Sequence, residues 1–328
     1  MVHMRIIVPA HQCDHVLDLL KPTPSVTNLV YLPGAAQKPE GDVILCDVAR
    51  EDASVVISDL RELDIPTEGS ISIEEVTTQI SVAADQAEKA TKGMAGDAVV
   101  WEEVESRTSE NIELNANFLA FFILACLIAS VGIILDNPIL IVGAMVVGPE
   151  FGPIAGLCVA FVQRRREVAL KSLEALAVGF PAGITAAFLF ALLIKTTGAV
   201  DVSIATTSRP LTQFISRPDG LSLVVAVFAG IAGMLSLTST KSGALIGVLI
   251  SVTTIPAAAN IGVAAAYGDW GEWRGAMAQL AVNLSGIFIA AVSTLYVQRR
   301  SYRRRRIAHL HDGAREAAGL PMGRSRRA

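Results

Sequence analysis

Six long apolar segments fill the region from residue 117 to residue 297, and this feature most constrains the fold. They cover residues 117–135, 139–162, 168–194, 221–238, 242–266 and 276–297. About 20 apolar residues in a helix span the ~30 Å hydrocarbon core of a lipid bilayer. We therefore expect an α-helical membrane protein with about six transmembrane helices.

Charge divides the chain into an acidic first third and a basic remainder. Residues 1–115 carry 8 Lys+Arg and 21 Asp+Glu, a net charge of −13, and the other 213 residues carry 19 and 10, a net charge of +9, which together give −4. Only 18% of all residues are charged, against about a quarter in soluble proteins. A single soluble domain, a disordered chain and a disulfide scaffold are excluded. The predicted domains are a cytoplasmic head (1–80), a helical connector (81–116), a transmembrane domain (117–298) and a basic tail (299–328).

Basic residues in the loops predict the orientation of the spans. With residues 1–116 in the cytoplasm, Gln163–Arg166, Lys241 and Arg299–Arg306 also fall on that side, as the positive-inside rule requires. The outer side then receives the turns at 136–138 and 268–275 and the loop 195–220. The first ten residues contain no apolar stretch long enough for a signal peptide. We expect a multi-pass protein of a bacterial inner membrane with both termini in the cytoplasm.

The two halves of the apolar region resemble each other weakly. Asn137–Pro153 can be set against Lys241–Pro256, which pairs Pro153 with Pro256 at an offset of 103 residues. Three spans separate the copies, so the halves form a candidate inverted 3+3 repeat, as in many secondary transporters. The alternative is that membrane helices rich in Gly and Ala resemble one another without a common origin.

The second span is predicted to be broken at its centre, where Gly148, Pro149, Gly152 and Pro153 lie close together. Proline removes a backbone donor and clashes with the preceding turn. Such a break persists at membrane depth only where protein or a water-filled cavity satisfies the freed groups. The fifth span is predicted to be broken near Pro256 in the same way.

Glu150 lies inside the break of the second span. An ionisable side chain near mid-bilayer is costly unless it faces a partner or water. Two interpretations stay open: a carboxylate that couples ions or protons, or a polar group that stabilises a subunit interface. Four further polar residues are candidates to line the same site: Thr253, Thr254, Asn260 and Asn283.

The head is predicted to be an α+β domain. Strands are expected at 4–10, 28–32, 42–48 and 70–76, and helices at 14–20 and 51–63. The order β-α-β-β-α-β is that of the ferredoxin-like fold. By analogy of fold alone, such a domain binds small ligands near its strand–helix loops.

His11, Cys13, Asp14 and His15 are the candidate ligand residues of the head. Imidazole and thiolate suit a soft metal, although the spacing matches no standard zinc site. A metal site, a ligand loop without metal and plain surface polarity all remain open. No metal or other cofactor is assigned.

The connector and the tail carry the remaining signals. Trp101 is expected to anchor at the membrane interface or on a neighbouring subunit. The tail holds ten arginines and two acids, which favour contact with anionic lipid; nucleic-acid binding is not expected, because no aromatic platform accompanies them. Glycines spaced through the spans permit close helix approach and predict a homo-oligomer: Gly143, Gly148, Gly152, Gly156, Gly230 and Gly233.

The stretch from Gly143 to Pro153, preceded by Ala129–Pro138, resembles the hallmark of the bacterial hydrophobic-protein family known as domain of unknown function 389. The resemblance runs from about Trp101 to Val297. It implies an integral membrane protein of bacterial type, and it supplies neither an activity nor a substrate. Family members commonly carry an apolar residue where this chain has Glu150, which weakens that carboxylate as a family-wide mechanistic residue.

Two functions are therefore expected. The first is a transporter or channel for a small solute or ion, regulated by a cytoplasmic ligand-sensing domain. The alternative is a non-transporting oligomeric membrane sensor or scaffold whose head binds a small ligand or partner. An enzyme is not expected, because the chain has no nucleophile elbow, phosphate loop or zinc-protease motif.

Overall fold

The computed structural model describes residues 1–76, 78–91, 99–198, 210–239 and 253–325. The chain divides into two compact units. Met1–Val104 and Val297–Ala328 form the first, which we call the head unit, and Glu105–Tyr296 form the second, the body unit.

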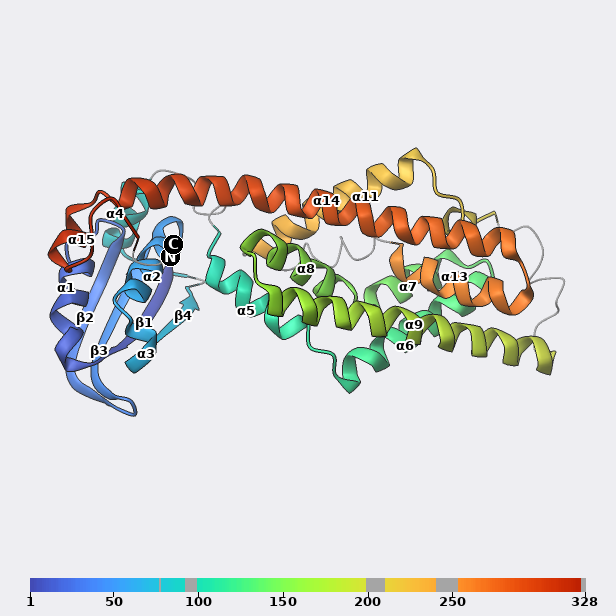
Figure 1. Cartoon of the computed structure of the whole chain (residues 1–328), viewed down its shortest axis with the longest axis horizontal. Coiled ribbons are helices and arrows are strands. Elements are labelled where there is room, and N and C mark those ends of the chain that lie inside the picture. Colours follow the sequence, from blue (N-terminus) through green and yellow to red (C-terminus); the bar gives the residue numbers. More distant parts are fainter. Residues whose placement is uncertain (77, 92–98, 199–209, 240–252, 326–328) are drawn as a thin grey trace. The chain divides into compact units, whose positions relative to one another are not determined.

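A four-stranded antiparallel sheet forms the centre of the head unit (Figure 1). Its strands are β1 (Val2–Val8), β2 (Val26–Gln37), β3 (Glu40–Val48) and β4 (Ser70–Glu75). They lie in the order β2-β3-β1-β4, so Met4 of the inner strand β1 faces Cys46 on one side and Ile73 on the other. Every second residue of β1 is buried, because successive side chains point to opposite faces of the sheet.

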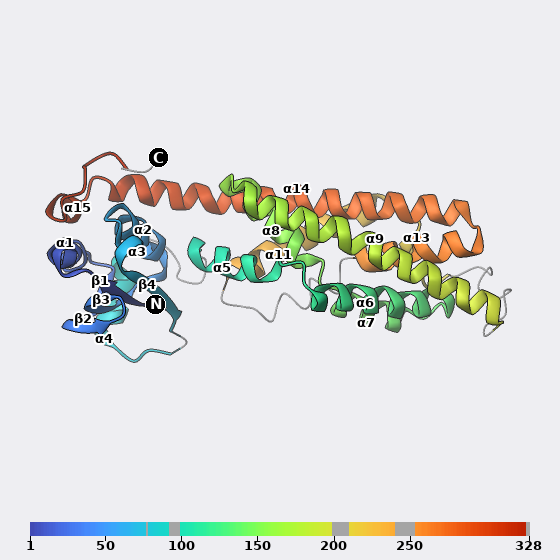
Figure 2. The ribbon, with the colours of Figure 1, turned by 60° about the horizontal axis from the view of Figure 1, so that its bottom comes forward.

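Helices α1 (Cys13–Leu20) and α2 (Arg50–Glu62) cover one face of this sheet (Figure 2). The apolar stripe of α1, with Val16 and Leu20, packs into the same core as β1. Shorter elements complete the head: η1 (Ala10–Gln12), α3 (Ile65–Glu68) and α4 (Val82–Ala90), the last packed against β2.

The predicted order of strands and helices in the head is found, whereas the extent of the second strand was predicted wrongly. Pro33 and Gly34 read as the end of a strand, but β2 continues to Gln37. The pairing of β2 with β3 shifts register between Leu32 and Ala36, and this bulge at an edge strand accommodates the proline and the glycine. The ferredoxin-like assignment stays a prediction.

The tail and most of the connector belong to the head unit, unlike the predicted domain limits. Val100 and Ala318 are buried in the same core as β1. Trp101 is buried there too, with its ring edge-to-face against Tyr302 at 6.4 Å. The expectation that Trp101 anchors at a membrane interface or on another subunit is therefore wrong. The tail ends in a short helix, α15 (Gly313–Ala317).

Helices make up the body unit. They are α6 (Ala116–Ile134), α7 (Pro138–Val147), α8 (Phe151–Gln163), α9 (Arg166–Thr197), α11 (Gly220–Thr238) and α13 (Thr254–Tyr267), with the short η3 (Gln213–Ile215). Helices α5 (Trp101–Asn111) and α14 (Trp270–His309) have residues in both units. In the described part of the chain, four helices are long and apolar enough to cross a membrane, or five spans if the bent pair of α7 and α8 counts as one.

Five of the six predicted spans coincide with such a helix or with the bent pair. The predicted fifth span, 242–266, lies partly outside the described residues. Its described part is α13, which has 14 residues. The count of six therefore stays a prediction, and a multi-pass membrane protein is compatible with the helices that are described.

Helices α6, α9 and α13 pack together in the core of the body unit (Figure 1). Close approach depends on glycines: a Cβ added at Gly183 of α9 would lie 2.6 Å from the Cys126 sulfur, and one at Gly262 of α13 would lie 2.5 Å from the Ile184 carbonyl oxygen. Gly156 and Gly230 likewise contact residues of their own chain. These glycines are therefore used within one chain, and the oligomer they were taken to indicate stays a prediction.

Candidate functional site

The predicted break in the second span is confirmed. Helix α7 ends at Val147, α8 begins at Phe151, and the two are bent by 51°. A Cβ at Gly148 would lie 2.4 Å from Glu150 Oε2 and 2.6 Å from Ile255 Cγ1, so only glycine fits there. The break thus lets the chain turn beside the start of α13.

Glu150 occupies the residue before α8 and is 2% exposed. Its Oε1 accepts a hydrogen bond from the hydroxyl of Thr254, the first residue of α13, at 2.6 Å. Its Oε2 has no hydrogen-bond partner within the described residues. The starts of α8 and α13 both carry the positive end of a helix dipole, which favours a negative group here. One carboxylate oxygen is therefore satisfied and the other is left open.

A second polar group begins at the neighbouring threonine. Thr253 accepts a hydrogen bond from the Asn283 amide of α14 at 2.7 Å. The Gln279 amide donates in turn to Asn283 Oδ1 at 3.3 Å, one helical turn away. Two adjacent threonines at the start of α13 thus contact Glu150 on one side and the amides of α14 on the other.

Asn260 lies elsewhere, contrary to the expectation that it lines the same site. Its amide donates to Glu272 at 3.2 Å, near the start of α14. Pro153 and Pro256 each occupy the third position of their helix, where a proline removes no intrahelical hydrogen bond. They mark the two helix starts and are not part of the polar contacts.

A cavity of about 430 Å³ lies beside the Thr253–Asn283 contact. Its polar lining comes from Gln213, Arg217, Asp219, Ser222, Thr253, Gln279 and Asn283. Its apolar lining comes from Pro210, Phe214, Leu221, Val225, Ala226 and Ile287. The volume is in the range of small-molecule pockets, roughly 300–1,000 Å³.

Sequence analysis missed Gln279 and the charged residues of this cavity. Gln279 and Asn283 stand four residues apart on an otherwise apolar helix, and this spacing was a usable signal. Arg217 gave none, because the loop before α11 had no recognisable pattern.

Loops at one end of the body unit are joined by hydrogen bonds. Asp136, in the turn between α6 and α7, accepts from the Thr212 amide at 2.9 Å and from its hydroxyl at 2.8 Å. Ser216 in turn lies 3.4 Å from Glu272 at the start of α14. Another polar contact pairs Arg165, between α8 and α9, with Glu105.

In the head unit, Cys13 contacts Tyr31 and Asp42. The Tyr31 hydroxyl donates to Asp42 Oδ2 at 3.0 Å, and the Gly34 amide donates to Oδ1 at 2.7 Å. The Gly34 amide is the main cause of a lowered pKa of Asp42, and burial is the main cause of a raised pKa of the Cys13 thiol. The hydrogen bonds to Cys13 and Asp42 raise the pKa of Tyr31. A neutral thiol and phenol therefore face a stabilised carboxylate.

The other predicted ligand residues of the head each have a different neighbour. His11 is exposed and lies 3.7 Å from Glu68. His15 is exposed beside Gly319 of the tail, and Asp14 is exposed. Among the residues that the structure describes, no group of three His, Cys, Asp or Glu side chains is placed to hold a metal ion.

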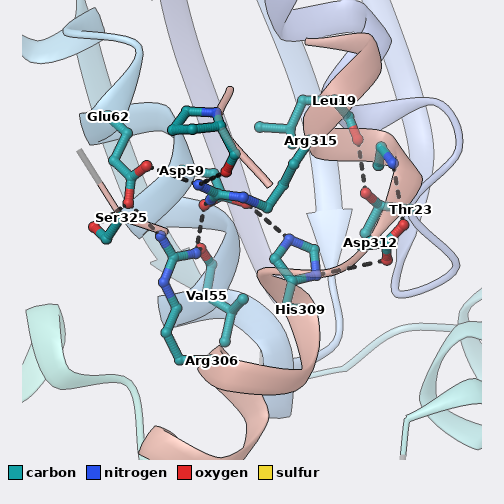
Figure 3. A network of polar contacts seen from close by, with 12 residues as sticks. Leu19, Thr23, Val55, Asp59, Glu62, Arg306, His309, Asp312, Arg315 and Ser325 are labelled. Carbon is teal, nitrogen blue, oxygen red and sulfur yellow. Dashed lines mark hydrogen bonds and ion pairs between the residues drawn. The ribbon is translucent and has the colours of Figure 1, made fainter. Parts of the chain in front are cut away.

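Buried ion pairs join the tail to α2 (Figure 3). Arg306 and Arg315 each contact both Asp59 and Glu62, and Arg315 is fully buried. The ring of His309 lies 2.7 Å from Asp59 Oδ2. Two of the ten tail arginines are thus bound inside the head.

Together these features define a class: a helical protein with several membrane-length apolar helices and a small α+β head. The profile of the family described as "Domain of unknown function (DUF389)" matches residues 145–289, and over this stretch the chain is similar to that family. The resemblance drawn from the Gly143–Pro153 motif is confirmed.

An uncharacterized protein of the archaeon Methanocaldococcus jannaschii is 24% identical over 196 residues. The alignment covers 60% of this chain and 58% of the archaeal protein, so this chain spans less than two thirds of that relative. No solved structure matches the chain.

Proposed function

We propose that this protein is a membrane transporter or channel for a small solute or ion, in which Glu150 takes up and releases the coupling ion. One observation carries the proposal: a buried carboxylate with one satisfied and one open oxygen sits where a broken helix meets the start of another helix. Most buried carboxylate oxygens are paired, and an oxygen without a partner is available to bind a proton or an ion.

A proton fits this site better than a metal cation. Only Glu150 and Thr254 supply side-chain oxygens in the hydrogen bonds described there. Hard cations such as Ca²⁺ take six to eight oxygen ligands.

The loop contacts support the proposed orientation in a cell membrane. The turn at Asp136, the segment with Thr212 and Ser216, and Glu272 all belong to regions assigned to the outer side from the charge pattern. Arg165 and Glu105 belong to regions assigned to the cytoplasm. Each contact thus joins two regions assigned to the same side.

Helix boundaries support the inverted repeat. Helices α6 and α11 both have 19 residues, begin 104 residues apart and are capped by the side chain of the preceding residue. Helices α8 and α13 begin 103 residues apart, and α9 and α14 begin 104 apart. The counterpart of α7 falls on residues 240–252, outside the described part of the chain.

Helix packing repeats as well. A Cβ at Gly179 of α9 would lie 2.9 Å from Phe122, the seventh residue of α6. A Cβ at Gly286 of α14 would lie 2.9 Å from Ala226, the seventh residue of α11. In both pairs a glycine packs against the seventh residue of the partner helix, although the two glycines are 107 residues apart, three more than the starts of α9 and α14.

At the next contact along the same helices the glycine lies on α9 in the first half and on α11 in the second half. Gly183 of α9 faces Cys126, the eleventh residue of α6. In the other half, Ala290 of α14 faces Gly230, the eleventh residue of α11. A common packing plan explains this correspondence better than composition alone.

Flux measurements test the function. Liposomes with a pH-sensitive dye inside would receive a panel of amino acids, organic acids and inorganic ions. We expect at least one solute to drive a proton flux that Glu150→Gln abolishes. Glu167→Gln, an exposed acid on α9, serves as the matched control and should leave the flux unchanged. A panel that gives no flux at all would favour the alternative, a non-transporting sensor or scaffold.

Topology is tested independently of flux. Three apolar spans separate residue 113 from residue 218, so Glu113→Cys and Pro218→Cys should react with an impermeant maleimide from opposite sides of the membrane. The four native cysteines are buried and give a low background. Labelling of both positions from the same side would overturn the inverted repeat.

The proposal also covers the role of the head, the oligomeric state and the contact of the tail with lipid. The head is proposed to sense a small ligand, and the chain to assemble as a homo-oligomer. Exposed arginines of the tail, such as Arg303 and Arg304, are proposed to contact anionic lipid.

A further inference from the structure

The cavity of the body unit is lined by charged, amide and apolar side chains. They come from helix α11, helix α14, the start of α13 and the segment before α11. The amides include Gln279 and Asn283, which are 2% and 4% exposed. Amide side chains are rare on lipid-facing surfaces, and amides that line a pocket are typical of sites that orient a polar ligand.

The amides of the cavity and Glu150 contact two adjacent residues, Thr253 and Thr254. Asn283 donates to Thr253, and the next residue, Thr254, donates to Glu150. A ligand that displaces the Asn283 amide therefore acts on the same helix start that holds the carboxylate. The cavity has a direct structural route to the proposed coupling group.

Arg217 supplies the available charge of the cavity. Asp219, the other ionised residue, accepts hydrogen bonds from the Ser222 amide at 2.7 Å and from its hydroxyl at 2.8 Å, so it is engaged as the cap of α11. Arg217 contacts the Gln213 amide oxygen at 2.6 Å in the orientation that matches donors to acceptors. Within the described chain no carboxylate lies at ion-pair distance from Arg217. Guanidinium is a preferred partner of carboxylate groups.

The cavity also has an apolar lining, which includes Phe214, Leu221, Val225 and Ile287. A ligand that fills the cavity must therefore present an apolar body to these side chains as well as an anionic group to Arg217. An inorganic anion would satisfy only the arginine.

We propose that the cavity binds a small organic carboxylate with an aliphatic body, its carboxylate on Arg217. The assignment rests on the proposed function, since it names the substrate class of the same transporter. Protonation of Glu150 and occupation of the cavity are then linked through Thr253 and Thr254.

Three probes of similar size separate the chemical requirements: 4-methylpentanoate, leucine and 3-methylbutylamine. Binding to the detergent-solubilised full chain would be followed by calorimetry. We expect the two carboxylates to bind and the amine not to bind. Equal binding of the amine, or no binding of either carboxylate, would overturn the proposal.

Two variants locate the site. Arg217→Gln should weaken carboxylate binding about 10- to 100-fold, the loss of one charge-assisted hydrogen-bonded contact. Val225→Trp should block it by filling the cavity. Arg274→Gln removes an exposed arginine that does not line the cavity and should leave binding unchanged. Unchanged binding in Arg217→Gln would overturn the assignment even if the protein folds normally.

Failures of the two proposals have different signatures. Binding of 4-methylpentanoate without any flux would overturn transport and keep the site. Glu150-dependent flux that Arg217→Gln and Val225→Trp leave unchanged would overturn the site and keep transport.

Discussion

Two regions of this molecule bury carboxylates, and they treat them differently. In the head unit, Asp59 and Glu62 are each held by two arginines. In the body unit, Glu150 has one threonine donor and one oxygen without a partner among the described residues. A saturated carboxylate holds structure together, whereas a half-satisfied one retains the capacity to bind something else. The contrast teaches that burial alone does not identify a functional acid, and that the partners of each carboxylate oxygen must be compared as well.

The largest expected effect comes from removing the buried cation of the head. Arg315→Leu leaves two buried carboxylates with one arginine fewer, and breaking a buried ion pair costs about 3–5 kcal/mol. Hydrogen exchange of the β1 and β3 amides in the full chain measures the loss. Arg303→Leu, at an exposed tail arginine, should change the exchange by less than about 0.5 kcal/mol. Equal effects of the two variants would contradict the structural role of the buried arginine.

The two classes of acid are compared directly by isosteric replacement. Asp59→Asn removes the charge that balances two arginines and should destabilise the head by about 3 kcal/mol. Glu150→Gln keeps an acceptor for Thr254 and removes an unbalanced buried charge, so the stability of the body should change by less than about 1 kcal/mol. Unfolding in detergent, followed by hydrogen exchange of each unit, tests both. A large loss in Glu150→Gln would make that acid a structural group.

A smaller effect is expected from filling the space beside the open oxygen. Gly148→Ala puts a methyl group where Glu150 and Ile255 already lie, and overpacking costs about 1–3 kcal/mol. We expect thermal unfolding of the body at lower temperature together with reduced flux. Gly143→Ala is the control, because a Cβ there meets nothing within 4 Å. If Gly148→Ala were as harmless as its control, the packing around Glu150 would be looser than the structure has it.

The smallest effect concerns Asp42, a buried acid bound only by neutral donors. Asp42→Asn keeps one oxygen that accepts a hydrogen bond and should cost about 1 kcal/mol at pH 7, the net value of a typical hydrogen bond. Because the folded pKa of Asp42 is lowered, its contribution is present above the unfolded pKa near 3.9 and is lost as the pH falls through the folded pKa. The difference in stability between Asp42→Asn and the parent should therefore shrink below about pH 4.

The reaction of the buried Cys46 thiol with dithiodipyridine measures this stability, because it reports opening of the head. Burial raises the pKa of this thiol to about 12. A difference that persists at low pH would contradict the lowered pKa.

The sequence predicted the features of the structure that depend on residues close together in the chain. Alternation in residues 70–76 predicted a strand, and the Gly148–Pro153 cluster predicted a helix break; the structure contains both. Glu150 was selected because an acid in an apolar helix is conspicuous. Thr254 was among the polar residues expected to line the same site, but no local pattern links residues 104 positions apart, so the hydrogen bond itself was not predicted.

The tail illustrates what a local pattern could not reveal. A run of arginines beside a span predicted lipid contact, yet Arg306 and Arg315 bind acids about 250 residues away in the sequence. Charge patterns do not distinguish an arginine that faces water from one whose partner is distant in the chain. The burial of Asp59 depends on the tertiary fold of the head, which periodicity does not specify.

The head unit is built from the two ends of the chain, and this determines the order in which its parts are synthesised. Asp59 and Glu62 leave the ribosome long before Arg306 and Arg315, because the whole of Glu105–Tyr296 is translated in between. About 250 residues separate these acids from their counter-ions, so at roughly 5–20 residues per second they wait on the order of 10–50 s. The nascent head therefore remains incomplete until the apolar segments of the body unit have been synthesised.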